Sequence, residues 1–292
     1  MIGATGNLGR ALMNMPNTIA CPIRFEDADN FEQWFEENKN VDTVWYIARE
    51  LLNSCYWENV AGILFSRHSE ALDNIFENFL ELGYNVSYWL LDANDYGVPQ
   101  NRKRVIIVGY PVSYEEHFMP PEPEEYKPNL KDVIYDLRKN ATPALENNRP
   151  NPKLKIPNHE YMIGGFSTMY MSRNRIRSWD EPSFTIQAGG RHAPCHPQAP
   201  KFELVKKDLR RFAKDKEDLY RRLTVRECAR IQTFPDSHIF KYKNVADGYK
   251  MIGNAVAVDF ASKLAKKIKK DLRRMSNMPI KFNKKGSLLK HK

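Results

Sequence analysis

Four arginines near the middle of the chain have the type and spacing expected of residues that read bases. Arg173, Arg175 and Arg177 alternate along the sequence, so an extended backbone would point all three the same way. Arg191 follows the flexible pair Gly189-Gly190. Arginine is the commonest reader of guanine in the major groove, because its planar guanidinium donates two parallel hydrogen bonds. We therefore take these four as candidate DNA-binding residues; the alternative is that some contact only phosphate, and we expect that at least one does.

Four short segments carry the other residues suited to chemistry, and their order is informative. They are Glu58-Asn-Val60, Gln100-Asn-Arg102-Lys-Arg104, Arg226-Glu-Cys-Ala-Arg-Ile-Gln-Thr-Phe-Pro235 and Gly253-Asn-Ala-Val256. Each alone is a weak signal, since such short matches arise by chance in many chains. Taken alone, Glu58 could be a solvated carboxylate at a strand end, and the two arginines could be surface charges beside a strand.

In this order, and with an arginine-rich stretch between the second and third, the segments resemble the later motifs of the DNA cytosine-5 methyltransferases. The resemblance runs from about Glu58 to about Leu272 and is strongest to bacterial restriction–modification enzymes that methylate GGCC. Segments similar to that subgroup are Pro157-Asn-His-Glu-Tyr161, Met171-Ser-Arg-Asn-Arg175, His196-Pro-Gln-Ala-Pro200 and Leu219-Tyr-Arg-Arg-Leu-Thr-Val225. The resemblance implies that S-adenosylmethionine is the cofactor and that double-stranded DNA is the substrate.

The resemblance also implies a mechanism and assigns three catalytic residues. In the family, a cysteine thiolate adds to carbon 6 of a cytosine that has left the duplex, and carbon 5 then takes the methyl group. Glu58 corresponds to the acid that shares a proton with ring nitrogen 3, for which its pKa would need to be raised. Arg102 and Arg104 would anchor the flipped nucleotide through its carbonyl oxygen and flanking phosphate.

The two later segments receive different roles. By resemblance Asn254, with Ala255 and Val256, contacts the cofactor; the alternative for Asn254 is a turn residue before a helix. Thr224-x-x-Glu227 is a capping box, so the adjacent Arg226-Glu227 pair is expected to cap and brace a helix that runs to Ile231.

The family's earlier motifs do not precede Glu58. The sequence has no Phe-x-Gly-x-Gly cofactor loop and no Pro-Cys-Gln segment with the nucleophile, and the 57 residues before Glu58 are too few for a complete cofactor-binding half. Cys21 lies 37 positions before Glu58, near where the nucleophile would fall, but Pro22 follows it and no Gln does. Cys21 is thus a poor candidate for the nucleophile, which the sequence otherwise lacks. Cys55 is expected to be a core residue.

Gly3-Ala-Thr-Gly-Asn-Leu-Gly9 resembles a dinucleotide-binding turn. A functional turn of this kind needs a strand before it and a helix after it, and only Met1 and Ile2 precede it. Three hypotheses therefore stay open. The chain is a methyltransferase, alone or with a second chain that carries the missing motifs; it is a non-catalytic DNA-binding fragment; or it binds a nicotinamide cofactor through Gly3 to Gly9.

Local patterns predict the elements that position these residues. Apolar residues at helical spacing predict helices over 44–52, 72–80 and 260–272, and Gly83 should end the second. Residues 86–90 and 104–108 are predicted strands, joined by a turn at 94–99. Five prolines lie within 111–130, which marks a boundary, and 131–223 has no strong period.

We therefore predict an α/β fold, an S-adenosylmethionine-dependent methyltransferase-like (Rossmann-like) sheet that is N-terminally incomplete, with a small irregular target-recognition domain. The expected divisions are a divergent remnant at 1–57, the second half of the catalytic domain at 58–115, the target-recognition domain at 116–223, a return to the catalytic domain at 224–274 and a loose basic tail at 275–292.

Composition limits the class of protein. The net charge is +9, and 201–292 hold 26 Lys and Arg against 10 Asp and Glu, which suits a polyanionic partner, although a solvated lysine-rich face is the alternative. Four distant cysteines without a CxxC spacing predict reduced thiols and no metal site. No apolar run approaches a membrane span and no secretory signal is evident, so we expect a cytoplasmic, DNA-associated protein without a membrane partner.

Overall fold

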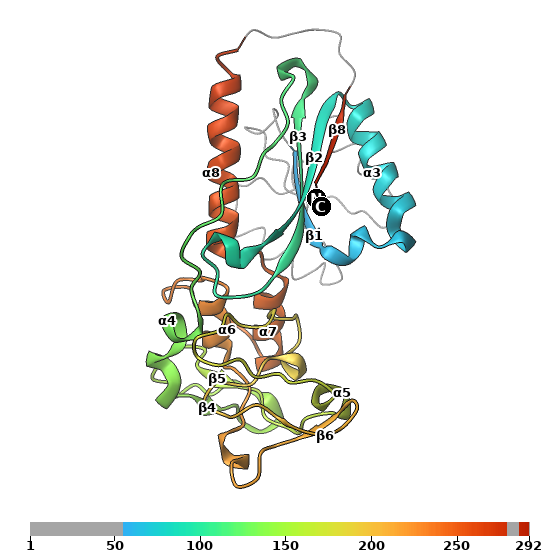
Figure 1. Ribbon diagram of the computed structural model, residues 1–292. Helices are drawn as coiled ribbons and strands as arrows, with labels where there is room; N and C mark the ends of the chain where they lie inside the picture. The colour runs from blue at the N-terminus through green and yellow to red at the C-terminus, as the bar shows by residue number, and fades with distance from the viewer. Residues whose placement is uncertain (1–54, 279–285, 292) are drawn as a thin grey trace. The chain divides into compact units, whose positions relative to one another are not determined.

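The computed structural model describes residues 55–278 and 286–291, which fall into two compact units (Figure 1). Unit 1 takes the described residues up to Leu91, Lys103–Glu122 and those from Leu264 onward; unit 2 takes Asp92–Arg102 and Pro123–Lys263. The predicted helix over 44–52, Cys21 and the Gly3–Gly9 turn lie outside the described residues, as does the side chain of Cys55.

Unit 1 is built on a four-stranded sheet in the order β1-β3-β2-β8. Its strands are β1 (Cys55–Val60), β3 (Lys103–Pro111), β2 (Tyr84–Asp92) and β8 (Leu288–His291). β1 runs antiparallel to β3, and β8 runs parallel to β2. The predicted strands 86–90 and 104–108 are confirmed, and both are longer than expected.

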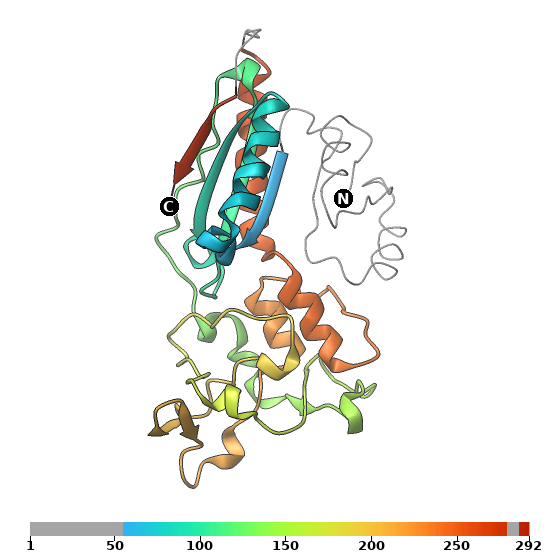
Figure 2. The ribbon, with the colours of Figure 1, turned by 90° about the vertical axis from the view of Figure 1, so that its right-hand side faces the viewer.

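Helix α3 (Ser69–Glu81) and the unit 1 part of α8 (Val258–Met275) lie on opposite faces of this sheet (Figures 1 and 2). The buried side chains between α3 and the sheet are Leu72, Phe76, Phe79, Val86, Tyr88, Val105 and Ile107. On the other face, the hydroxyl of Tyr110 in β3 donates to Asp271 of α8 at 2.9 Å. Both helices were predicted from their apolar spacing, and Gly83 follows α3 at φ 82° as expected.

The predicted loose tail is wrong for its last part. Leu288 to His291 form β8, which pairs with β2 from Val86↔Leu288 onward. Side-chain bonds hold the entry to this strand, since Asn85 Oδ1 accepts from both the backbone N and the Oγ of Ser287. Leu288 also packs on the apolar cluster under α3. Leu288 and Leu289, a short apolar pair in a basic tail, thus form a strand because they pair with β2, which would otherwise be an edge strand and lies about 200 residues away in sequence.

Unit 2 has many short elements joined by long irregular stretches, as predicted for 131–223. Its helices are α4 (Leu130–Ile134), α5 (Thr168–Met171), α6 (Val225–Ile231), α7 (Val245–Asn254) and the first turns of α8. Its strands are the parallel pair β4 (Thr142–Pro143) and β5 (Glu160–Tyr161) and the antiparallel pair β6 (Glu203–Lys206) and β7 (Leu209–Arg211). Residues 224–263 cluster in this unit, whereas the predicted domain boundary at 223/224 stays a prediction.

Short 3-10 helices connect these elements. They are η2 (Ala61–Leu64), η3 (Ser66–His68) and η5 (Val112–Tyr114) in unit 1, and η4 (Ala93–Tyr96), η6 (Asp136–Lys139), η7 (Glu146–Asn148), η8 (Gly190–His192) and η9 (Glu217–Leu219) in unit 2.

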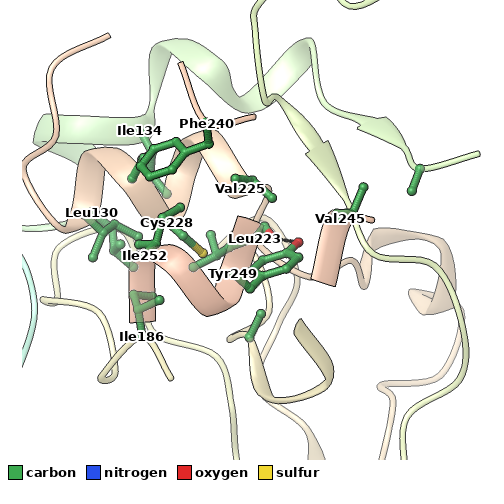
Figure 3. Close-up of a cluster of buried hydrophobic side chains, with 14 residues drawn as sticks. Leu130, Ile134, Ile186, Leu223, Val225, Cys228, Phe240, Val245, Tyr249 and Ile252 are labelled. Atoms are coloured by element: carbon green, nitrogen blue, oxygen red, sulfur yellow. Dashed lines mark hydrogen bonds between the residues drawn. The ribbon is translucent and has the colours of Figure 1, made fainter. Parts of the chain in front are cut away.

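The core of unit 2 lies around α6 and α7 (Figure 3). The two helices pack apolar side chains such as Cys228, Tyr249 and Ile252 against one another and against Leu130 and Ile134 of α4. The predicted capping box is confirmed, because the Thr224 side chain accepts from the backbone N of Glu227 and the Glu227 side chain accepts from that of Thr224. No helix among the described residues is both long and apolar enough to cross a membrane.

Candidate functional site

Glu58 and Arg104 form an ion pair on the sheet of unit 1. The register pairs Glu58 with Ile106 and Val60 with Arg104, so the two charged side chains are diagonal neighbours on one face of adjacent antiparallel strands. Glu58 Oε1 lies 2.7 Å from Arg104 Nε, and the two side chains keep 18% and 11% of their surface exposed. The structure therefore brings together two of the three residues predicted to be catalytic.

Tyr56 lies two residues before Glu58 on β1, and therefore on the same face of the strand. Burial, reinforced by the nearby Glu58 charge, raises the pKa of Tyr56, so its hydroxyl stays protonated. Sequence reasoning did not select this residue. The alternation of β1 is the signal that could have found it, once Glu58 had been placed on a strand rather than at its end.

Arg102 lies in unit 2, where it joins a buried group of three polar side chains that we call the polar hub: Gln100, Arg102 and Gln232. The Arg102 side chain donates from Nη1 to the Ile186 carbonyl at 3.1 Å and from Nη2 to the carbonyls of Gly253 and Ala255, each at 3.0 Å. The residue is 3% exposed. Its contacts thus position backbone, and its predicted contact with a nucleotide stays a prediction.

The two glutamines of the hub complete a network between distant segments. Gln100 Nε2 donates to Gln232 Oε1 at 3.2 Å, and Gln100 Oε1 accepts from the Ile186 backbone N at 2.7 Å. Gln232 in turn donates to the Ile252 carbonyl at 3.0 Å. Three of the four motif segments therefore meet at one buried point, an arrangement that none of them predicts alone.

The hub fixes the segment predicted to contact the cofactor. Gly253 makes a close backbone approach, because a Cβ there would lie 2.3 Å from the backbone of Gln187 and Ala188. Ala255 is extended (φ −73°, ψ 149°), with its carbonyl bound by Arg102. Asn254 ends α7 and keeps its side chain at the surface, while Val256 is half-buried. The turn interpretation and the cofactor interpretation of Asn254 both fit this placement.

The four candidate DNA-binding arginines differ in their surroundings. Arg173 and Arg191 are exposed. Arg175 is half-buried, with its guanidinium 5.4 Å from the Tyr170 ring centroid. Arg177 donates to Glu181 at 2.8 Å and lies 4.2 Å from the Phe184 ring centroid, so it is held inside unit 2.

The expected structural role of Arg226 and Glu227 is confirmed. Arg226 is buried and donates to the carbonyls of Pro157 and His238, at 3.0 and 2.8 Å. Glu227 accepts two bonds from Arg221, at 2.7 and 2.8 Å. Burial alone would raise the pKa of Glu227, but the Arg221 bonds lower it to about 2. These charges brace the core rather than face a ligand.

Neither of the two cysteine thiols that the structure describes offers a nucleophile. Cys195 and Cys228 are buried and free. Burial raises the pKa of Cys195 to about 11 and raises that of Cys228 well above its ordinary value, so neither forms a thiolate near neutral pH. Across the part of the chain that the structure describes, no three His, Cys, Asp or Glu side chains gather as metal ligands.

The family model described as C-5 cytosine-specific DNA methylase matches residues 53–270. The chain therefore belongs to the C-5 cytosine-specific DNA methylase family.

Two relatives show how much of such proteins the chain spans. It is 58% identical over 221 residues to the Type II methyltransferase M.MthTI of Methanothermobacter thermautotrophicus, covering 75% of this chain and 67% of that protein. It is 49% identical over 219 residues to M.FnuDI of Fusobacterium nucleatum, covering 74% of this chain and 64% of that protein. The chain thus spans about two thirds of the length of these relatives.

A solved structure shares the fold. A mutant of Spodoptera frugiperda DNMT2 superimposes with a TM-score of 0.50 at 14% identity, covering 90% of each chain. At this identity the likeness supports the mixed α/β methyltransferase fold alone.

Proposed function

We propose that this protein transfers a methyl group from S-adenosylmethionine to carbon 5 of a cytosine in double-stranded DNA. The single observation that carries the proposal is the Glu58–Arg104 pair, held 2.7 Å apart on the sheet of a chain that belongs to the cytosine methylase family. We further propose that the target site is GGCC, that the protein belongs to a restriction–modification system, and that it works in the cytoplasm. The Type II methyltransferases among its relatives support the second of these.

The pair suits the edge of a cytosine ring. Nitrogen 3 and the carbonyl at carbon 2 are neighbours on that ring, so a carboxyl and a guanidinium side by side can bind both at once. Glu58 would share a proton with nitrogen 3 and thereby accept the negative charge that develops when carbon 6 is attacked. Arg104 would orient the ring through the carbonyl oxygen and hold the Glu58 carboxyl in place.

Arg102 would act on this reaction indirectly. Its bonds to the Gly253 and Ala255 carbonyls fix the backbone on either side of the exposed Asn254. S-adenosylmethionine supplies the methyl group when it is bound, and an exposed amide at a fixed backbone position fits one polar contact to it. We propose that Asn254, Ala255 and Val256 form this part of the cofactor site.

A second candidate function follows because no cysteine has been identified as the nucleophile. The sequence contains no Pro-Cys-Gln, Cys195 and Cys228 are buried, and Cys21 lies outside the described residues. Under this candidate the chain binds DNA without catalysing transfer, or it does so only with a second chain that supplies the thiolate and the remaining cofactor contacts.

The test is transfer of labelled methyl from S-adenosylmethionine to a GGCC duplex, with a scrambled duplex as control. We expect transfer to GGCC, and we expect Glu58→Gln to lower it by about 100-fold or more, because general acid–base catalysis commonly contributes that much. Glu70→Gln is the matched control, since it makes the same change on the exposed start of α3 in the same unit.

The outcomes separate the two candidates. If the wild type transfers methyl and Glu58→Gln transfers it at a similar rate, Glu58 has no part in the mechanism. Specific GGCC binding without transfer, in a sample shown to be folded, would favour the second candidate and direct attention to a chain that carries Pro-Cys-Gln.

A further inference from the structure

The antiparallel hairpin of unit 2 stands outside the sites described above. We call residues 201–216, which contain β6 and β7, the basic ribbon. The two strands form a sheet of their own, and they turn at Lys207-Asp208, where Asp208 adopts a left-handed φ of 58°. A two-stranded ribbon has no core between sheets, so something else must hold it in a fixed position.

Aromatic packing holds the root of the ribbon. Phe202 precedes β6 and Phe212 follows β7, and their ring centroids lie 5.7 Å apart. Phe212 also stacks on Tyr220 at 4.3 Å, within the apolar cluster around Tyr170. The ribbon is therefore fixed at one end and projects at the other.

The projecting part of the ribbon exposes two adjacent apolar side chains. Leu204 is 66% exposed and the adjacent Val205 is 52% exposed. The register shifts between Leu204 and Lys206, so Val205 lies in a β-bulge that interrupts the alternation of β6. Isolated exposed apolar residues are normal on a protein surface, so the charges of the ribbon must indicate what it binds.

The charge of the ribbon indicates the chemistry of that partner. Residues 201–216 hold seven Lys and Arg against three Asp and Glu. The cross-strand pair of Arg211 with Glu203, at 2.9 Å, neutralises one cation. At the tip, Lys206 and Lys207 are exposed, and among the described residues neither has an ion-pair partner. The tip therefore presents two available ammonium groups, which suits a polyanion.

Two hydrogen bonds tie the root of the ribbon to the candidate DNA-binding arginines. Arg210 donates to the Ser172 carbonyl, next to Arg173. The backbone N of Phe202 donates to Asn174 Oδ1 at 3.3 Å. The ribbon thus keeps a fixed position relative to the segment 172–175, so a duplex that contacts these arginines is held at a set distance from the ribbon.

We propose that the basic ribbon binds duplex DNA outside the recognised base pairs, with Lys206 and Lys207 contacting phosphates; this rests on the proposed DNA substrate. A four-residue strand extends about 13 Å, which carries the tip beyond its aromatic root. Lysine ammonium groups bind phosphate as point charges and carry no sequence information. The ribbon therefore adds affinity and footprint, whereas the arginines supply specificity.

The test measures binding against salt for Lys206→Gln/Lys207→Gln. The DNA probes are a GGCC duplex of about one helical turn and another of about three turns, roughly 10 and 30 base pairs. On the longer duplex the slope of log K against log salt should fall by about 2, since each phosphate contact contributes about 0.9. The affinity loss should be equal for GGCC and scrambled sequences, and the fall in slope should be no larger on the shorter duplex than on the longer one.

Two control variants isolate the position of the charge. Lys206→Arg/Lys207→Arg keeps both cations and should keep the wild-type slope. Lys269→Gln/Lys270→Gln removes the same charge from the exposed face of α8 and should leave the slope unchanged. Thermal melts confirm that each variant is folded.

An unchanged slope for the ribbon variant on the longer duplex would overturn the inference, and so would an equal fall for the α8 variant. A wild-type chain that binds no duplex of either length would overturn the proposed DNA substrate itself, which separates the two failures.

Discussion

The polar hub and the segment 172–177 both depend on arginine, and the two regions use it in opposite ways. In the hub, Arg102 is buried and donates to three backbone carbonyls. In the segment, Arg173 is exposed, Arg175 lies over a ring and Arg177 pairs with a carboxylate. The guanidinium thus fixes backbone in the hub, whereas in the segment only that of Arg173 is exposed to a ligand.

The difference teaches that burial and nearby acceptors decide the role of an arginine, and that its motif does not. A buried guanidinium must satisfy its donors inside the protein, because an unpaired buried charge costs several kcal/mol. An exposed guanidinium is solvated whether or not it has a protein partner, so leaving it unpaired costs the fold little and it can bind a ligand. The comparison predicts that variants of the hub lose stability, whereas variants of the exposed arginines lose affinity.

The largest effect should come from Arg102→Met. This change leaves the Ile186 and Gly253 carbonyls without their donor, and each unsatisfied buried carbonyl costs about 1–3 kcal/mol. We expect the free energy of unfolding to fall by about 3 kcal/mol, measured by urea denaturation. Arg104→Met is the matched control. It should lower the free energy of unfolding by only about 1 kcal/mol, because its partner Glu58 is partly exposed. It should nevertheless abolish most methyl transfer. Equal stability losses would remove the distinction between the two arginines.

Gly253→Ala tests the hub from the backbone side. A Cβ at this position would lie 2.3 Å from the Gln187 carbonyl carbon, and backbone cannot move aside as a flexible side chain can. We expect a loss of about 2–3 kcal/mol, which is typical of overpacking in a core. Gly165→Ala is the control, because a Cβ there meets nothing within 4 Å. A Gly253→Ala protein with the wild-type urea midpoint would show that the close approach is not required.

Much of the secondary structure could be predicted because its signals are local. The apolar spacing of α3, the glycine after it and the Thr224–Glu227 capping box each lie within one or two turns of chain. Glu58 and Arg104 were selected differently, through the order of the four motif segments and the family that this order resembles. Their adjacency could not be predicted, because it depends on the antiparallel register of β1 and β3.

The hub and β8 were missed for a related reason. The carbonyls that Arg102 binds lie 84 to 153 residues further along the chain, and no local pattern records such a distance. The resemblance assigned Arg102 a catalytic role, so its role in positioning backbone was not predicted. For β8, Leu288 and Leu289 are too short a signal to stand out in a basic tail.

Acid should weaken the buried network around His196 and leave the hub unchanged, because the hub has no group that titrates near neutral pH. Burial lowers the pKa of His196 to about 4, although Glu227 lies 3.5 Å away. The unfolded chain therefore takes up this proton first, so stability is fully present above about pH 6.5 and is lost as pH falls toward 4. The expected slope is about 1.4 kcal/mol per pH unit for this group.

Urea denaturation from about pH 7 to about pH 4.5 measures this slope. His196→Asn, which cannot take up the proton, should show a shallower dependence on pH. A residual slope is expected from His159, because burial lowers its pKa as well. Identical slopes for the variant and the wild type would assign the acid sensitivity elsewhere.

The smallest effect distinguishes two arginines of the recognition region. Arg191 is exposed beside Gly190, which lies so close to Met162 and Tyr249 that a Cβ there would meet both within 2.8 Å. Its backbone is therefore fixed while its side chain remains available. Arg191→Ala should weaken GGCC binding about tenfold and scrambled binding less, since one bidentate base contact contributes about 1–3 kcal/mol of discrimination.

Arg177→Ala is the counterpart and should change binding by about twofold or less, because Glu181 already holds its guanidinium and a partly exposed pair of this kind contributes little. Fluorescence anisotropy on both duplexes measures the two variants. A larger loss of affinity for Arg177→Ala than for Arg191→Ala would mean that the Arg177–Glu181 ion pair opens when DNA binds. Arg177 would then exchange Glu181 for a base. In that case the contacts of an arginine in the free protein would not predict its role in the complex, and the comparison between the hub and the segment would hold only for buried donors.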